Sequence, residues 1–79
     1  MSYSDLQLAA MATTQPLKLV QILNSPNADI QVLVSGAEIL GAELKDEELV
    51  SPTLKKLLSH INVLVREASI IGIIEFYTS

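Results

Sequence analysis

The sequence contains no cysteine and only three glycines among its 79 residues. The lack of cysteine excludes disulfides, thiolate catalysis and cysteine-ligated metal sites, and it fits a reducing compartment. All three glycines fall within segments that we expect to be helical, so the chain has no glycine-rich loop that could hold a phosphate group. Neither a nucleophile motif nor a paired-histidine metal motif is present.

Basic residues are also scarce. The chain has five lysines and arginines against nine acidic residues, which gives a net charge of −4. Only Lys55 and Lys56 are adjacent in the sequence. Nucleic-acid binding draws its affinity from clustered basic side chains that displace counterions. We therefore expect no nucleic-acid partner, and no anionic membrane surface for the same reason.

Long apolar runs are missing as well. The longest nearly apolar segment, residues 70–76, contains Glu75 and is far shorter than the roughly 20 residues of a membrane-spanning helix. Residues 1–15 have no basic stretch before their apolar positions, so we do not expect a signal peptide. These features predict a soluble, cytoplasmic protein.

What the chain does have is a high apolar content. Apolar residues make up 49% of the sequence and charged residues 18%, whereas an average globular chain has about 25% charged residues. A chain of this length forms one small domain, here residues 1–79, with a thin margin of stability. We expect part of the apolar surface to lie at an interface with a protein partner or with a second copy.

Apolar residues recur at steps of three and four, which is typical of helices. No segment alternates as a half-buried strand does, so the predicted fold class is all-α. Residues 45–51 are expected to form a polar connector, either irregular or with a helical turn of its own, and Ser4 and Ser51 are expected to cap the first and fourth helices. Five short helices are predicted: one that begins at Asp5 and ends between Met11 and Thr14, and four at about Pro16–Leu23, Asp29–Leu44, Pro52–Ser59 and Asn62–Tyr77.

The third and fifth predicted helices contain an internal repeat. Residues 32–41 align with residues 63–72 at a constant offset, and Ala37 and Gly41 match Ala68 and Gly72. A shorter, leucine-rich segment that begins at a proline precedes each of them, which gives two units at about 16–44 and 52–77. Each glycine costs a helix about 1 kcal/mol relative to alanine. Repeating that cost at the same place predicts a close helix–helix contact.

The second unit carries a recognisable pattern. It reads Pro-Thr-Leu-Lys-Lys-Leu-Leu at 52–58, and then Val-Arg-Glu-Ala at 65–68 with Gly72 at the end. This pattern resembles HEAT/armadillo-type helical repeats. The resemblance implies an antiparallel helix pair in each unit, a right-handed stack, and a role as a protein-binding scaffold without common catalytic residues.

The first unit departs from the pattern, because Ser35 stands where the second unit has Arg66. Repeat arrays also need about three units to be stable alone, and this chain has two with a leading helix. Either the leading helix caps the stack or a second copy of the chain completes it.

The last predicted helix is apolar on two sides. One stripe (Ile61, Leu64, Val65, Ala68, Ile71) is expected to pack in the core. A second stripe lies nearly opposite at 100° per residue and is the candidate protein interface; it consists of Val63, Ile70, Ile74 and Tyr77. The alternative is a central helix whose two sides are both covered by its own chain.

Few other side chains indicate a site. The acidic run at residues 46–48 is either a solvated connector near a helix start or a site for a basic peptide or a metal. His60 is interpreted as a turn residue, and Arg66 and Glu67 are expected on an exposed ridge. No arrangement predicts a catalytic residue, a metal ligand or a cofactor.

The sequence therefore predicts a non-enzymatic interaction module, an adaptor or regulator that binds protein through helical surfaces and associates as a homodimer. An alternative is a structural assembly subunit whose self-association is its function. A third hypothesis, an enzyme or small-ligand protein with a pocket between its helices, lacks any supporting motif.

Overall fold

The structure is a computed structural model, and it describes residues 3–78. The described chain contains five α-helices and no strand, which confirms the all-α prediction. The helices are α1 (Asp5–Thr14), α2 (Pro16–Leu23), α3 (Ile30–Glu43), α4 (Glu47–Leu57) and α5 (Val63–Thr78).

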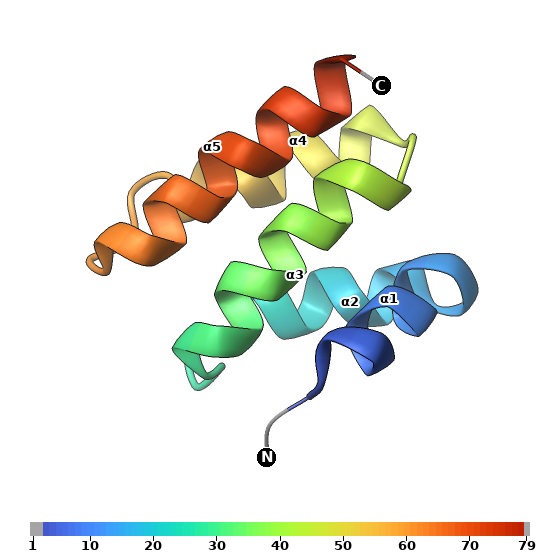
Figure 1. Ribbon diagram of the computed structural model, residues 1–79, viewed down its shortest axis with the longest axis horizontal. Helices are drawn as coiled ribbons and strands as arrows, with labels where there is room; N and C mark the ends of the chain where they lie inside the picture. The colour runs from blue at the N-terminus through green and yellow to red at the C-terminus, as the bar shows by residue number, and fades with distance from the viewer. Residues whose placement is uncertain (1–2, 79) are drawn as a thin grey trace.

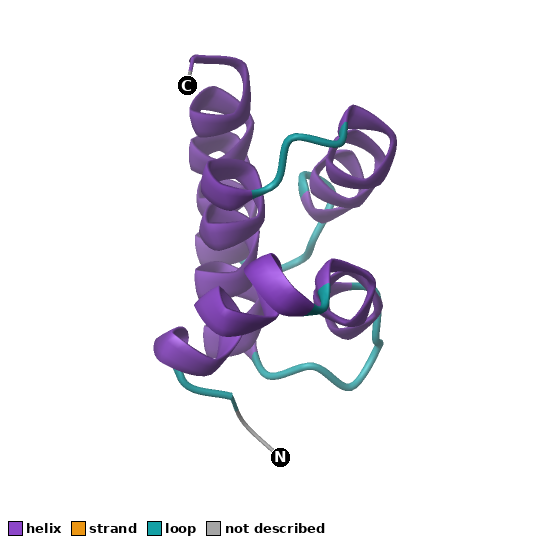
Figure 2. Ribbon diagram, turned by 90° about the vertical axis from the view of Figure 1, so that its right-hand side faces the viewer, coloured by secondary structure: helices purple, strands orange, loops and turns teal. Residues whose placement is uncertain are grey.

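The helices form two layers. In Figure 1, α3 and α5 lie side by side and run in the same direction, while α2 and α4 lie behind them. Figure 2 shows the same arrangement from the side, with α3 and α5 forming one tall layer. α1 packs against both α3 and α2. α3 is therefore the central helix, because it contacts all four others.

The predicted start of the first helix is confirmed. The Ser4 side chain accepts a hydrogen bond from the Gln7 N–H at 3.1 Å, and the Gln7 side chain accepts one from the Ser4 N–H at 2.8 Å. This reciprocal pair satisfies two backbone N–H groups that a helix start otherwise leaves unpaired. α2 begins at Pro16, where a missing N–H has no consequence.

The fourth helix begins earlier than the sequence predicted. α4 starts at Glu47 rather than at Pro52, and its cap is Asp46, whose side chain accepts from the Glu48 N–H at 3.0 Å. Val50 is fully buried and anchors this first part of the helix in the core. The predicted start of this helix at Pro52, with Ser51 as its cap, was wrong, and most of the predicted connector is helical. A proline can also lie inside a helix, at the cost of one backbone hydrogen bond.

The closest helix contact lies between α3 and α5, at the aligned small residues. A Cβ atom added at Gly72 would lie 2.5 Å from the carbonyl oxygen of Ala37, and one added at Gly41 would overlap the backbone of Gly72. The two backbones approach this closely only because no side chain intervenes. The predicted close contact at the repeated glycines is therefore present: Gly41 faces the backbone of Gly72, and Gly72 faces that of Ala37.

The predicted core stripe of α5 was only partly right. Val65 and Ala68 are buried, but Leu64 and Ile71 are 56% and 43% exposed, and Ile61, just before the helix, is 93% exposed. The buried face of α5 is centred on its small residues because these permit the close contact with α3. The helix is apolar on nearly every side, so periodicity alone did not identify the packed side.

Candidate interaction surface on α5

α3 and α4 cover one side of α5, and the opposite side carries large apolar side chains that contact no other helix closely enough to bury them. We call this side the outer face. Its six apolar residues are between 43% and 59% exposed: Val63, Leu64, Ile70, Ile71, Ile74 and Tyr77. Monomeric proteins rarely expose contiguous apolar patches of this kind without a function.

All four residues that the sequence singled out as a candidate interface lie on this face. Val63, Ile70, Ile74 and Tyr77 follow one another at steps of seven, four and three residues, which places them along one side of a helix. The sequence reasoning missed Leu64 and Ile71. The repeated Ala68 and Gly72 mark the packed side, so the side opposite them could have been identified as the outer face.

One charged residue lies in the middle of the outer face. Glu67 is exposed, as expected, and is three or four residues away from Val63, Leu64, Ile70 and Ile71. Residues at these spacings are neighbours on a helix surface. The Glu67 carboxylate is thus surrounded on the helix by four exposed apolar side chains, and any partner that covers the face must accommodate it.

Tyr77 fixes the C-terminal end of the outer face to α4. Its hydroxyl group donates a hydrogen bond to the Glu47 carboxylate at 2.8 Å. This bond raises the pKa of Tyr77 above its ordinary value of 10.0, because the neutral phenol donates it and ionisation would remove it; the charge of the Glu47 carboxylate adds a smaller effect in the same direction. The ring also packs edge-on against Phe76, with centroids 5.0 Å apart.

The other end of α5 is fixed by the turn that precedes it. Arg66 donates from its guanidinium group to the carbonyl oxygens of His60 at 2.7 Å and of Ile61 at 3.0 Å. Arg66 is partly buried, so the prediction that it lies on an exposed ridge was wrong. His60 is a turn residue, as predicted, and its Nδ1 accepts from the Asn62 N–H at 3.0 Å. Asn62 caps α5 by accepting from the Leu64 N–H.

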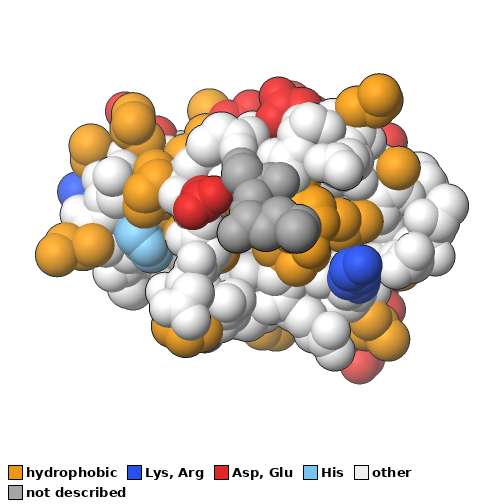
Figure 3. Space-filling model, turned by 90° about the horizontal axis from the view of Figure 1, so that it is seen from below, with side chains coloured by type: hydrophobic (Ala, Val, Ile, Leu, Met, Phe, Trp, Pro, Cys, Tyr) orange, Lys and Arg blue, Asp and Glu red, His pale blue; other side chains and the backbone are white. Residues whose placement is uncertain are grey.

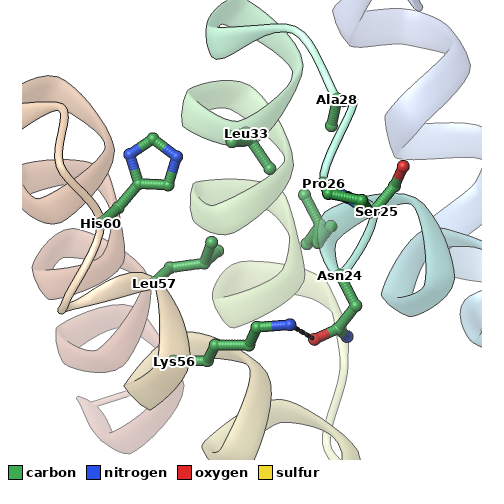
Figure 4. Close-up of a pocket in the computed structure, with 9 residues that line it drawn as sticks. Asn24, Ser25, Pro26, Ala28, Leu33, Lys56, Leu57 and His60 are labelled. Atoms are coloured by element: carbon green, nitrogen blue, oxygen red, sulfur yellow. Dashed lines mark hydrogen bonds between the residues drawn. The ribbon is translucent and has the colours of Figure 1, made fainter.

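A pocket of about 230 Å³ lies between the α2–α3 turn and the end of α4. Figure 4 shows Leu33 and Leu57 in its apolar floor and Lys56 reaching across to Asn24. The Lys56 ammonium group donates to the Asn24 Oδ1 at 3.2 Å. The bond joins α4 to the end of α2, so a polar link spans one side of the pocket.

The remaining exposed apolar residues do not form a second face. Leu6, Leu17 and Ile30 lie on three different helices, α1, α2 and α3, and Ile61 lies just before α5. In Figure 3, which views the molecule from below, hydrophobic side chains lie in separate groups among polar ones. Singly exposed apolar side chains are normal on protein surfaces.

Among residues 3–78, no three histidine, aspartate or glutamate side chains are grouped as metal ligands. The acidic run at 46–48 begins α4, where Asp46 is the cap and Glu47 and Glu48 lie in the first turn, beside the positive end of the helix dipole. Within the described range, none of the helices has the length and apolar character needed to span a membrane.

Comparisons with known proteins do not add to this picture: no protein-family model, no curated protein and no solved structure matches the chain. The resemblance to HEAT/armadillo-type repeats therefore stays a prediction.

Proposed function

We propose that this protein is an interaction module that binds a second copy of itself through the outer face of α5. The observation that carries the proposal is the presence of six large apolar side chains, each about half exposed, on one side of a single helix. The proposed function needs neither catalysis nor a cofactor. The cysteine-free composition supports a cytoplasmic setting.

The apolar surface is large enough to drive a reversible dimer. Fully burying a valine, leucine or isoleucine side chain contributes about 1.5–3 kcal/mol. Covering six half-exposed side chains on each of two copies would therefore contribute roughly 9–18 kcal/mol before costs. Association itself costs on the order of 4–15 kcal/mol. At the midpoints of these two ranges about 4 kcal/mol remains, which corresponds to a dissociation constant of about 1 mM and to a dimer that dissociates on dilution.

A closed dimer fits the surface better than an open assembly does. When the same patch is used on both copies around a two-fold axis, the contact is complete after two copies have met. An open assembly needs a second contact surface, and the other exposed large apolar residues of the described chain are scattered over α1, α2, α3 and the segment before α5. This argument favours a discrete dimer over a structural assembly subunit.

Sedimentation equilibrium of the wild-type chain and two aspartate variants tests the proposal. Ile74→Asp places a charge on the outer face, where the wild-type side chain is 55% exposed, and should reduce dimer affinity by tenfold or more while the monomer stays helical. Leu17→Asp is the matched control, because Leu17 is 61% exposed on α2, away from that face.

Equal loss of the dimer in both variants, or a wild-type chain that stays monomeric at high concentration, would contradict the proposal. A wild-type mass far above that of a dimer would support the assembly subunit instead. Circular dichroism on each variant separates a lost contact from a lost fold.

A further inference from the structure

The pocket between the α2–α3 turn and the end of α4 has an apolar floor whose shape is fixed by the core. Its volume is about 230 Å³, and three of the residues that line it, Leu23, Leu33 and Leu57, are buried members of the hydrophobic core. A ligand that enters does not have to order these side chains first. Apolar pockets with a few polar groups at defined positions are the usual sites for small molecules.

The polar side of the pocket is built from Asn24 and Lys56. The Asn24 Nδ2 group donates to the Val20 carbonyl oxygen at 2.8 Å, and its Oδ1 atom accepts from the Lys56 ammonium group at 3.2 Å. The end of α2 thus holds the ammonium group at the edge of the apolar floor, as Figure 4 shows. An ammonium group has three N–H donors, and this bond uses one of them.

The charge of the lining residues favours an anionic ligand. Among the nine described residues that line the pocket, Lys56 carries the only permanent charge, and its partner there is a neutral amide. A carboxylate beside Lys56 would form a charge-assisted hydrogen bond, whereas a cation would meet a like charge. His60 adds a second donor: its Nδ1 accepts from the Asn62 N–H, so the neutral ring carries its proton on Nε2.

The helix ends beside the pocket do not reverse this preference. α2 and α4 both end there, and each helix C-terminus carries a negative partial charge of about half an elementary charge. Lys55 and Lys56, in the last turn of α4, carry two full positive charges. The carbonyl groups of that turn also accept from the N–H groups of residues 58–60, so they are already paired within the chain.

The volume of the pocket limits the ligand to a small molecule. Pockets for drug-sized ligands measure about 300–1,000 Å³, and an apolar cavity of about 150 Å³ holds benzene. A volume of about 230 Å³ therefore suits an apolar group of roughly five or six carbon atoms with one polar group attached.

We propose that this pocket binds small aliphatic carboxylic acids, with the aliphatic chain on the leucine floor and the carboxylate on the Lys56 ammonium group. None of the described residues that line the pocket belongs to α5. The inference therefore goes beyond the proposed function and does not depend on it.

A titration of the wild-type chain with hexanoate at pH 7, followed through the magnetic resonance signals of the backbone amides, tests the site. The signals of residues 23–28, 56–57 and 60 should change and saturate, with a dissociation constant on the order of 1 mM, which is usual for so small a ligand. Hexanol has the same carbon chain without the charge. It should bind about three- to tenfold more weakly than hexanoate.

Lys56→Gln and Lys55→Gln form a matched pair of variants. Both remove one lysine from the last turn of α4, but Lys56 lines the pocket and Lys55 does not. Lys56→Gln should weaken hexanoate binding by about three- to tenfold and leave hexanol binding unchanged. Lys55→Gln should change the binding of either ligand by less than about twofold. Circular dichroism checks that both variants keep the helix content of the wild type.

No saturable change with hexanoate, or changes centred outside the pocket, would overturn the site. Equal binding of hexanoate and hexanol, or equal losses in the two lysine variants, would overturn the pairing with Lys56 and carboxylic acids as the class of ligand. The dimer is measured by sedimentation and does not enter these comparisons, so its failure and the failure of this inference are distinguishable.

Discussion

At the scale of single residues, the three glycines differ in what surrounds them. A Cβ atom at Gly41 would meet the backbone of Gly72, and one at Gly72 would meet the Ala37 carbonyl oxygen. At Gly36 the nearest atom is instead the Cδ2 methyl group of Leu23. Backbone cannot move aside without shifting a whole helix, whereas the tip of a leucine side chain can rotate. The same residue type is therefore required at two of these positions and replaceable at the third.

This difference predicts opposite outcomes for two identical substitutions. Gly41→Ala should lower the free energy of unfolding by about 1–3 kcal/mol, because overpacking separates α3 from α5. Gly36→Ala should change it by less than about 1 kcal/mol, since the gain in helix propensity offsets the shift of Leu23. Urea unfolding of dilute protein measures both. Similar losses in the two variants would contradict the account of the α3–α5 contact.

At the scale of helices, the sequence predicted that the helices exist better than it predicted where they begin and which of their sides are buried. α1 and α2 begin at the residues that Ser4 and Pro16 indicated, because cap and proline chemistry is local. The start of α4 was misplaced because Pro52 was interpreted as a helix start, and the burial of Val50, which depends on the whole fold, was not visible. The repeated Gly72 indicated a close contact between helices but not which helix would make it.

The outer face of α5 was predicted in part for a similar reason. A helix that is apolar on nearly every side has no polar face to mark its exposed side. Val63, Ile70, Ile74 and Tyr77 were placed together correctly, but Leu64 and Ile71 were assigned to the core and are exposed. The missing information was the close approach of α3, which turns the small residues inward and the large ones outward.

The hydrogen bond between Tyr77, at the end of α5, and Glu47, at the start of α4, predicts how stability depends on pH. The neutral Tyr77 hydroxyl donates to Glu47, and this bond raises the pKa of Tyr77. The stability that it contributes is present below the unfolded pKa, near 10, and is lost as pH rises through the higher folded value. Glu47→Gln should lower the pKa of Tyr77 toward its ordinary value.

The absorbance of the phenolate reports this titration directly. Tyr3→Phe removes the other tyrosine, so the titration curve belongs to Tyr77 alone. A curve that does not move when Glu47 becomes glutamine would show that the hydrogen bond does not set the pKa.

At the scale of the whole molecule, the two units predicted from the sequence, residues 16–44 and 52–77, pack together mainly through α3 and α5. The small residues of α3 and α5 face each other, and the Lys56–Asn24 hydrogen bond joins the units on the side of α2 and α4. The small-residue side of α3 is covered by α5, and the small-residue side of α5 is covered by α3. What remains available is the large-residue side of α5, so association with a further chain is expected there.

The measurement that tests this central claim most directly is a map of the backbone amides whose magnetic resonance signals change between dilute and concentrated protein. The account predicts that the largest changes lie in residues 63–78, centred on Ile70, Ile71 and Ile74. Leu6 and Leu17, equally apolar and exposed at 81% and 61%, should change little. Changes centred on α1 or α2, or spectra that do not depend on concentration, would contradict it.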